Sequence, residues 1–68
     1  MKNFIKVERA KKDMTQAELA DELKVSRQTI NSIELGKFVP STVLSLKIAV
    51  FFKVKFEDLF ILEEDDWE

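Results

Sequence analysis

Hydrophobic residues recur at helical spacing along most of this chain, and polar residues divide them into short segments. A first helix is predicted over residues 3–12, with Asn3 as its cap. Residues 42–52 are apolar on nearly all sides and predict a central helix. A short final helix fits residues 56–60, and only residues 54–56 alternate as a strand would. The pattern is therefore typical of an all-α protein.

Two further helices begin at capping residues that stand 11 positions apart. Thr15 and Glu18 form a capping box, in which the hydroxyl and the carboxylate each accept a backbone amide of the other residue. Ser26 begins a similar arrangement, so that only residues 23–25 separate the two helices. The second of them ends at Gly36, the sole glycine, where a left-handed residue is favoured. Five helices are predicted in all.

Two short helices joined by a tight turn form a helix-turn-helix unit, whose second helix can enter the major groove of DNA. On a helical wheel, Ile30 and Ile33 point to one side, and an arc of about 140° on the other side contains no acid. The side chains of this arc are Arg27, Gln28, Asn31, Ser32 and Leu35. Because arginine pairs with guanine and glutamine with adenine through two hydrogen bonds, the arc is suited to reading bases. The alternative is an ordinary amphipathic helix, which also has a polar outer face.

Composition narrows the classes of function. The chain has 68 residues, enough for one small domain, and contains neither Cys nor His. This excludes a disulfide framework, a zinc site of thiolate or imidazole type and a histidine-activated nucleophile, and we expect no metal, no cofactor and no enzyme activity. The longest wholly apolar run, residues 48–52, is far shorter than the roughly 20 residues that span a bilayer. We expect a soluble, cytoplasmic protein without a small-molecule ligand.

Charge is distributed unevenly, although the net charge is only −2. Residues 63–68 hold five of the 13 acids and no base, so residues 1–62 carry 11 bases against eight acids. The net charge of this body is thus +3, which is compatible with a polyanionic partner. We therefore divide the chain into a DNA-binding domain, residues 1–62, and an acidic tail, residues 63–68, which we expect to be solvated. The alternative is that the tail binds a partner or masks charge.

Several longer motifs resemble a single family. They are MTQAELA at 14–20, VSRQTIN at 25–31, IELGK at 33–37 with Pro40 and Ser41 after it, LKIA at 46–49 and EDLF at 57–60. In this order and spacing they resemble the phage Cro and repressor type (Cro/C1) of helix-turn-helix regulator, including its small stand-alone members. The resemblance implies a five-helix, lambda-repressor-like domain that has no catalytic activity and binds operator DNA as a homodimer.

The resemblance also implies which residues touch double-stranded DNA. Those at base edges come from the second helix of the helix-turn-helix unit, which is called the recognition helix: Arg27, Gln28, Thr29, Asn31 and Ser32. Those that contact phosphate, and so position the protein without reading sequence, flank that helix: Thr15, Gln16, Ser26, Lys37 and the backbone near Phe38. The alternatives are that Gln16 is a plain first-turn residue and Lys37 an ordinary solvated lysine. Arg9 and Glu34 match a family pair, a structural ion pair between the first helix and the recognition helix.

Other positions depart from the family pattern. Asp13, Lys24 and Lys53 stand where the family usually has glycine at a helix end, so we expect three left-handed residues that cost about 1 kcal/mol each. Apolar side chains also stand where the surface is expected: Val7, Val39, Val43, Val50 and Phe51. This is more apolar surface than a small monomer should expose, which indicates self-association or a partner protein.

Two hypotheses of different class follow. The first is a transcriptional regulator, a repressor in its simplest form, that binds a pseudo-palindromic operator as a homodimer. The second is a protein-interaction module of antitoxin or coactivator type that uses the same fold. For a dimer we expect the contact at the apolar C-terminal end: Phe56, Leu59, Phe60, Ile61 and Leu62. The competing surface is the fourth helix with Val39, Val43 and Val50.

Overall fold

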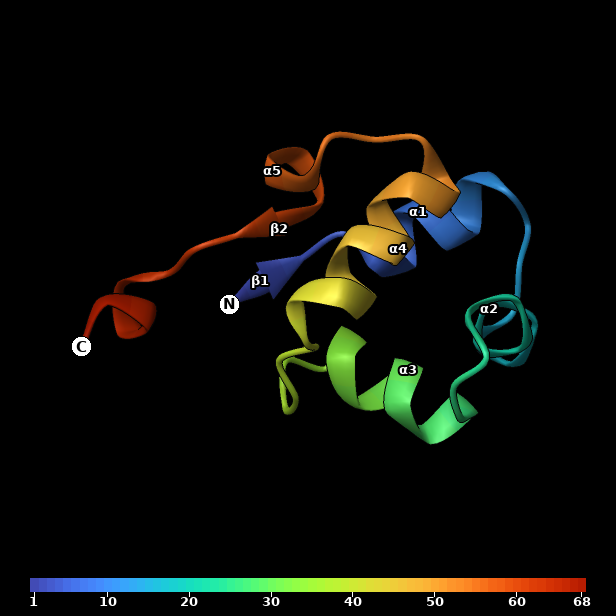
Figure 1. The fold of residues 1–68 in the computed structure, drawn as a ribbon, viewed down its shortest axis with the longest axis horizontal. Coiled ribbons are helices and arrows are strands. Elements are labelled where there is room, and N and C mark those ends of the chain that lie inside the picture. Colours follow the sequence, from blue (N-terminus) through green and yellow to red (C-terminus); the bar gives the residue numbers. More distant parts are fainter.

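The computed structural model describes residues 1–68, and it confirms five α-helices in the predicted order (Figure 1). Two very short strands and a C-terminal 3-10 turn accompany them. The elements are β1 (Lys2–Asn3), α1 (Ile5–Lys11), α2 (Gln16–Leu23), α3 (Arg27–Glu34), α4 (Thr42–Phe52), α5 (Phe56–Leu59), β2 (Phe60–Ile61) and η1 (Glu64–Trp67). None of the helices is long and apolar enough to cross a membrane.

The predicted caps of α2 and α3 are formed. The amide of Glu18 donates to Thr15 Oγ1 at 3.1 Å, while the amide of Thr15 donates to Glu18 Oε1 at 2.8 Å. The hydrogen bond from the Thr15 amide holds the pKa of Glu18 below its usual value, because it favours the charged carboxylate. At the start of α3, the amide of Thr29 donates to Ser26 Oγ at 3.0 Å. Each hydroxyl satisfies a first-turn amide that has no partner inside its helix, so both helices begin at the predicted residue.

The prediction that Asn3 caps the first helix is wrong in its boundary. The residue before α1 is Phe4, and Asn3 belongs to β1. Its side chain nevertheless holds the start of the helix, because Asn3 Oδ1 accepts the amide of Ile5 at 3.2 Å. Its Nδ2 donates to the carbonyl of Ile33 at 2.9 Å, which ties the N-terminal segment to the end of α3.

The three expected left-handed residues are confirmed. The φ angles are +55° at Asp13, +58° at Lys24 and +57° at Lys53, and Gly36 has φ +76°. Lys24 and Lys53 follow α2 and α4 directly, and their amides bond back to carbonyls of the last helical turn. The chain can thus end each helix sharply without glycine, at a cost in backbone strain.

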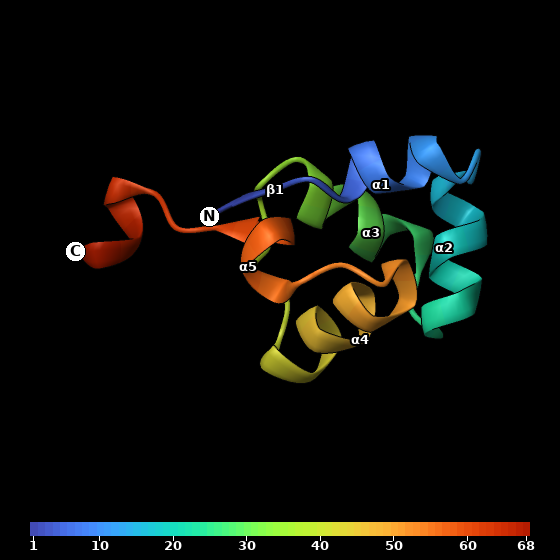
Figure 2. The ribbon, with the colours of Figure 1, turned by 90° about the horizontal axis from the view of Figure 1, so that it is seen from above.

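The small sheet was not predicted. Lys2 pairs with Ile61 and Asn3 with Phe60 in antiparallel register, and the amide of Phe4 donates to the carbonyl of Leu59 at 3.0 Å. Phe60, expected as the end of the last helix, therefore lies in β2, and residues 54–56 form no strand. The cause is pairing between the two ends of the chain, which local alternation cannot reveal. Figures 1 and 2 show η1 projecting from the body just beyond this sheet.

The core draws on every helix. Its eleven buried apolar residues are Ile5, Leu19, Ala20, Leu23, Ile30, Ile33, Ile48, Ala49, Phe52, Leu59 and Phe60. α4 is buried on one face only, although its sequence is apolar on nearly all sides. One face of α4 packs on the core through Ile48, Ala49 and Phe52, whereas Val43 and Val50 lie in solvent. The reason is that the other helices cover only one side of α4.

Candidate nucleic-acid interface

α2 and α3 are joined by a turn of three residues, and the left-handed Lys24 reverses the chain within it. The amide of Val25 donates to the carbonyl of Ala20 at 3.0 Å, which closes the turn against α2. On the inner side of α3, Ile30 and Ile33 are fully buried. Figure 1 shows α3 along the lower edge of the molecule, with its other side free of neighbouring elements. Core packing therefore decides which face of α3 is presented.

The outer face of α3 has the predicted composition. Arg27, Gln28 and Asn31 are exposed and surround a shallow hollow of about 290 Å³. The only acid of α3 is Glu34, whose side chain is just 6% exposed. The face consequently offers one cation and two amides to a ligand, and no exposed carboxylate lies beside them.

A second shallow hollow, of about 250 Å³, brings predicted base-reading and phosphate-binding residues together. It is lined by Ser26, Gln28, Thr29, Ser32 and Phe38. Ser26 Oγ and Thr29 Oγ1 lie 2.8 Å apart, so the two hydroxyls share a hydrogen bond. Thr29 and Ser32 are half-buried, so they lie at the edge of the outer face of α3. We call this outer face, with Arg27, Gln28 and Asn31 at its centre, the reading face.

The predicted phosphate-binding residues differ in whether they have a free hydrogen-bond donor for a phosphate. Lys37 is exposed, but the backbone amides of Lys37 and Phe38 already donate to the carbonyl of Ser32, at 2.9 and 3.3 Å. The expected contact through the backbone near Phe38 thus has no free amide at that residue. Thr15 is occupied by its capping box. At the start of α2, the amides of Gln16 and Ala17 have no partner within their helix, as expected for first-turn residues.

The predicted ion pair between Arg9 and Glu34 is formed and largely enclosed. Arg9 Nε lies 2.7 Å from Glu34 Oε2, and Arg9 Nη2 lies 3.0 Å from Glu34 Oε1. The remaining nitrogen, Nη1, donates to the carbonyl of Met14 at 2.8 Å. The hydrogen bond to Glu34 raises the pKa of Arg9. Since Arg9 is on α1, Met14 precedes α2 and Glu34 ends α3, one guanidinium joins three segments of the domain.

Hydrogen bonds connect this ion pair to the outer face of α3 through Gln16, which was predicted only as a phosphate contact. Gln16 Nε2 donates to Glu34 Oε1 and to Asn31 Oδ1, both at 3.1 Å. Sequence reasoning missed this network, because nothing local indicates that residue 16 of one helix faces residue 31 of the next. The only available signal was the matched Arg9 and Glu34 pair, which places the two helices close together.

The residues expected at a dimer contact are not equally available. Leu59 and Phe60 belong to the core of the single chain, with 1% and 4% of their surface exposed. They cannot offer an apolar surface to a second copy, and the expectation is corrected for these two. Phe56 and Leu62 are exposed and Ile61 is half-buried. The difference arises because β2 folds back onto the body and turns Phe60 inward.

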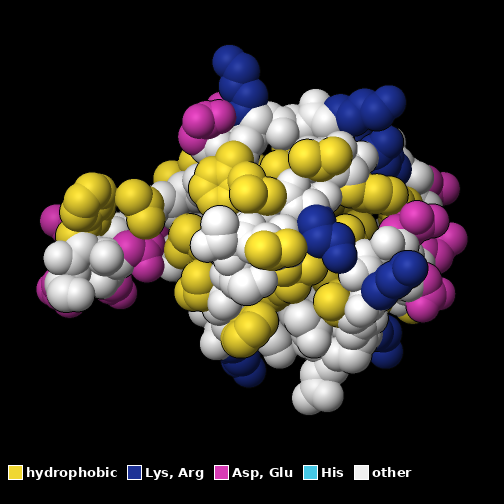
Figure 3. Space-filling view, viewed as in Figure 1, with side chains coloured by type: hydrophobic (Ala, Val, Ile, Leu, Met, Phe, Trp, Pro, Cys, Tyr) yellow, Lys and Arg dark blue, Asp and Glu magenta, His cyan; other side chains and the backbone are white.

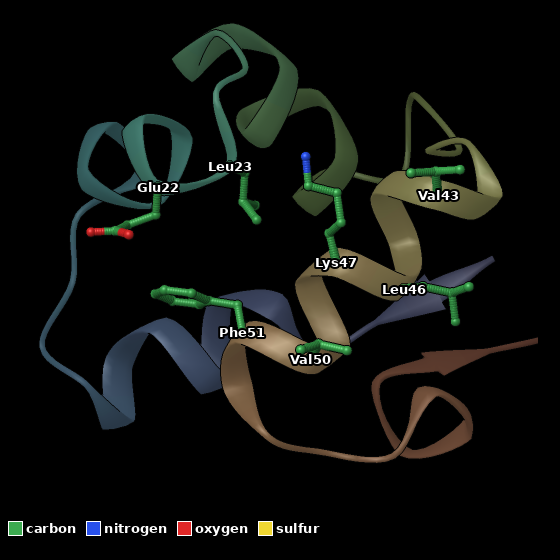
Figure 4. A pocket seen from close by; sticks show the side chains of 7 residues that line it. All are labelled: Glu22, Leu23, Val43, Leu46, Lys47, Val50 and Phe51. Carbon is green, nitrogen blue, oxygen red and sulfur yellow. The ribbon is translucent and has the colours of Figure 1, made fainter.

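The largest hollow lies elsewhere, between α2 and α4. It has a volume of about 490 Å³ and is lined by Glu22, Leu23, Val43, Leu46, Lys47, Val50 and Phe51. Figure 4 shows Val43, Leu46 and Val50 along α4, with Glu22 across from them on α2. We call the exposed residues Val43, Leu46 and Val50 the α4 stripe; their exposed fractions are 68%, 48% and 75%. Figure 3 shows apolar side chains gathered on the face where α4 lies.

Taken together, a helix whose exposed face carries no acid, held outward by a short turn from the helix before it, defines a DNA-binding domain of the helix-turn-helix class. The structure contains no cluster of acids that could hold a metal ion. The helix-turn-helix family model matches residues 5–59, so the chain belongs to this family of Cro/C1-type transcriptional regulators.

Relatives of the same size agree with this assignment. The uncharacterized HTH-type transcriptional regulator MJ0272 of Methanocaldococcus jannaschii is 56% identical over 66 residues, which cover 97% of this chain and all of the relative. An uncharacterized HTH-type transcriptional regulator of Archaeoglobus fulgidus is 49% identical over 69 residues, which cover all of this chain and 97% of the relative. YgzD of Bacillus subtilis, also an uncharacterized HTH-type transcriptional regulator, is 46% identical over 66 residues, 97% of this chain and all of the relative.

Proposed function

We propose that the protein is a repressor that binds a pseudo-palindromic DNA operator as a homodimer and blocks transcription by occupying the promoter. The observation that carries the proposal is the outer face of α3, which presents Arg27, Gln28 and Asn31 without an exposed acid. Since its relatives are bacterial and archaeal regulators, we also propose that it acts in the cytoplasm, where such cells keep their DNA.

In this proposal, Arg27 and Gln28 read base edges, because both are exposed in the first turn of α3 and can form two hydrogen bonds with one base. Asn31 stands beside them, while Thr29 and Ser32 contribute at the edge. Lys37 and the free amides at the start of α2 bind phosphate and fix the position on the duplex. No role requires a cofactor or small molecule.

Electrostatics supports the same orientation on DNA. Residues 1–62 carry the net charge of +3, and the acidic residues 63–68 follow β2 at the side of the molecule, away from α3 (Figure 1). Glu63 and Asp66 lie 3.2 and 3.3 Å from the Met1 ammonium group, which ties η1 to β1. This side position keeps the acids away from phosphate when α3 enters the groove.

A dimer is proposed because one helix-turn-helix covers only half an operator, and half-sites recur about 34–36 Å apart along the duplex. Of the exposed apolar surfaces, the α4 stripe is best suited to a second copy. The hollow that it borders shares no residue with the two hollows at the outer face of α3, so both copies can still face DNA. Glu22 and Lys47 flank the hollow with opposite charge, so a two-fold axis that passes between them would pair unlike charges across the contact.

The first test is a selection of bound sequences from a random DNA pool, followed by affinity measurements on the selected site. Arg27→Ala should weaken binding to that site by about 1–3 kcal/mol and relax the choice of one base pair. Lys37→Ala should weaken all DNA about equally and lower the slope of log affinity against log salt by about one. An Arg27→Ala variant with unchanged affinity and selectivity would disprove the assignment of readout.

The exposed α4 stripe also supports a second candidate, a module that binds a partner protein in place of DNA. The same selection separates the two. If the pool returns no preferred sequence and binding at physiological salt stays at the non-specific level, the interaction module is favoured and the repressor is rejected.

A further inference from the structure

A chain of hydrogen bonds runs from the enclosed ion pair to the surface that faces DNA. It begins at Arg9, passes through Glu34 and Gln16, and ends at Asn31 in the middle of α3. Asn31 borders the hollow that it shares with Arg27 and Gln28. The chemistry of each link determines the orientation of the next.

The first link fixes the Gln16 amide. Arg9 donates to both oxygens of Glu34, so each of these oxygens acts as a hydrogen-bond acceptor. The atom of Gln16 that lies 3.1 Å from Glu34 Oε1 must therefore be its amide nitrogen. The opposite orientation would bring a carbonyl oxygen against a carboxylate oxygen, which is repulsive.

The second link fixes the Asn31 amide. The Gln16 nitrogen can only donate, so the Asn31 atom 3.1 Å away from it must be the oxygen Oδ1. Because an amide group is planar, Asn31 Nδ2 is then on the opposite edge, and it donates to no other atom of the chain. Gln16 has used both of its amide protons, so its side chain has no donor left for a phosphate.

We propose that Gln16 is a positioning residue that turns Asn31 into a hydrogen-bond donor, so that Asn31 favours guanine over adenine in the major groove. This inference rests on the proposed function. Asparagine commonly pairs with adenine, donating to N7 and accepting from the N6 amino group. An Asn31 whose oxygen is held by Gln16 offers only its amino edge, which suits the two acceptors of guanine, N7 and O6.

The experiment compares sequence selection by the full chain and by two glutamine variants. Asn31→Ala first identifies the base pair that residue 31 contacts, as the position where preference is lost. Gln16→Met keeps the length of the side chain and removes its amide, so Asn31 is free to rotate. The excess of guanine over adenine at this base pair, expected to be about 5- to 10-fold, should fall to near one, with other positions unchanged.

Gln28→Met is the matched control, because it makes the same chemical change on the outer face of α3, and Gln28 forms no hydrogen bond with Asn31 or Glu34. It should change a different base pair and leave the guanine preference intact. Asn31→Asp gives a second test that does not depend on Gln16 variants. Its carboxylate can still accept from Gln16 but presents an acceptor to DNA, so the preference should move from guanine to cytosine, whose edge offers an amino group.

The outcomes separate this inference from the proposed function. If the parent chain selects no sequence, the proposed function fails. If the parent selects a site but Gln16→Met weakens all sequences equally and lowers the salt slope by about one, Gln16 is a phosphate contact and the inference fails. An unchanged base preference in Gln16→Met, or an adenine preference in the parent at the Asn31 position, overturns it as well.

Discussion

At the scale of single residues, the chain places bulky or charged side chains in conformations that favour glycine. Asp13, Lys24 and Lys53 have φ between +55° and +58°, where a Cβ atom crowds the following carbonyl. All three are exposed, so no tertiary contact of the side chain compensates for the strain. Gly36 is the one position with a positive φ that has the favoured residue. The domain thus tolerates local strain at three helix ends.

Replacing Lys24 by glycine should therefore stabilise the protein. We expect a gain of about 0.5–1 kcal/mol, since the relief of left-handed strain exceeds the entropy that glycine adds to the unfolded chain. Lys12→Gly is the control, because Lys12 also ends a helix but has φ −99°. Thermal unfolding followed by circular dichroism should show a higher midpoint for Lys24→Gly alone. A gain of equal size in both variants would contradict the strain argument.

At the scale of helices, the position of α3 depends on an ion pair that reaches it from α1. The side chains of Arg9 and Glu34 are 14% and 6% exposed, so both charges are shielded from water. Removing one partner leaves the other charge without compensation, which costs more than the pair itself contributes. Glu34 is also the acceptor that orients Gln16, so the same carboxylate supports both the fold and the reading face.

Glu34→Ala should lower the free energy of unfolding by about 3 kcal/mol, because Arg9 then loses its counterion in a shielded site. The midpoint of thermal unfolding should fall by roughly 12–24 °C. Glu64→Ala, in the exposed turn η1, should leave the midpoint nearly unchanged. The double replacement Arg9→Met with Glu34→Leu should recover much of the loss, since no charge remains unpaired. Coincident melting curves for the two glutamate variants would count against the pair.

At the scale of the whole molecule, two of the exposed apolar surfaces are candidates for a dimer contact, the α4 stripe and the C-terminal segment. Leu59 and Phe60 fill the core, which leaves Phe56, Ile61 and Leu62 as the C-terminal candidates. The valines at the two ends of the α4 stripe are the more exposed set, with fractions of 68% and 75%. Burial of apolar area drives association, so the α4 stripe should contribute more per residue.

Val50→Glu should dissociate the proposed dimer, because it brings a charge into an apolar contact. Sedimentation equilibrium at tens of micromolar should give twice the chain mass of 8.0 kDa for the parent and a single chain for the variant. Val7→Glu, an exposed valine on α1, is the matched control and should remain dimeric. If Leu62→Glu dissociates the dimer and Val50→Glu does not, the contact lies at the C-terminal segment. A parent that is monomeric even on a palindromic site would reject the dimer.

Much of the helix-turn-helix could be predicted from sequence because its signals are local. The caps at Thr15 and Ser26 act over three residues, and the helix over residues 42–52 has the predicted bounds. The inward direction of Ile30 and Ile33 follows from helical periodicity alone, which also determines that Arg27 and Gln28 face outward. The Arg9 and Glu34 pair was available only through the family resemblance.

The sequence by itself thus determined where α2, α3 and α4 begin and which side of α3 is polar, since both depend on neighbours within about one helical turn. Tertiary structure decided which residues contact each other across the fold and which stay exposed. It paired residues 2–3 with 60–61, left the α4 stripe open, drew Phe60 inward, and placed Gln16 between Asn31 and Glu34. These contacts join segments that are 15 or more positions apart. Their geometry arises from the packing of the whole core, which no local pattern contains.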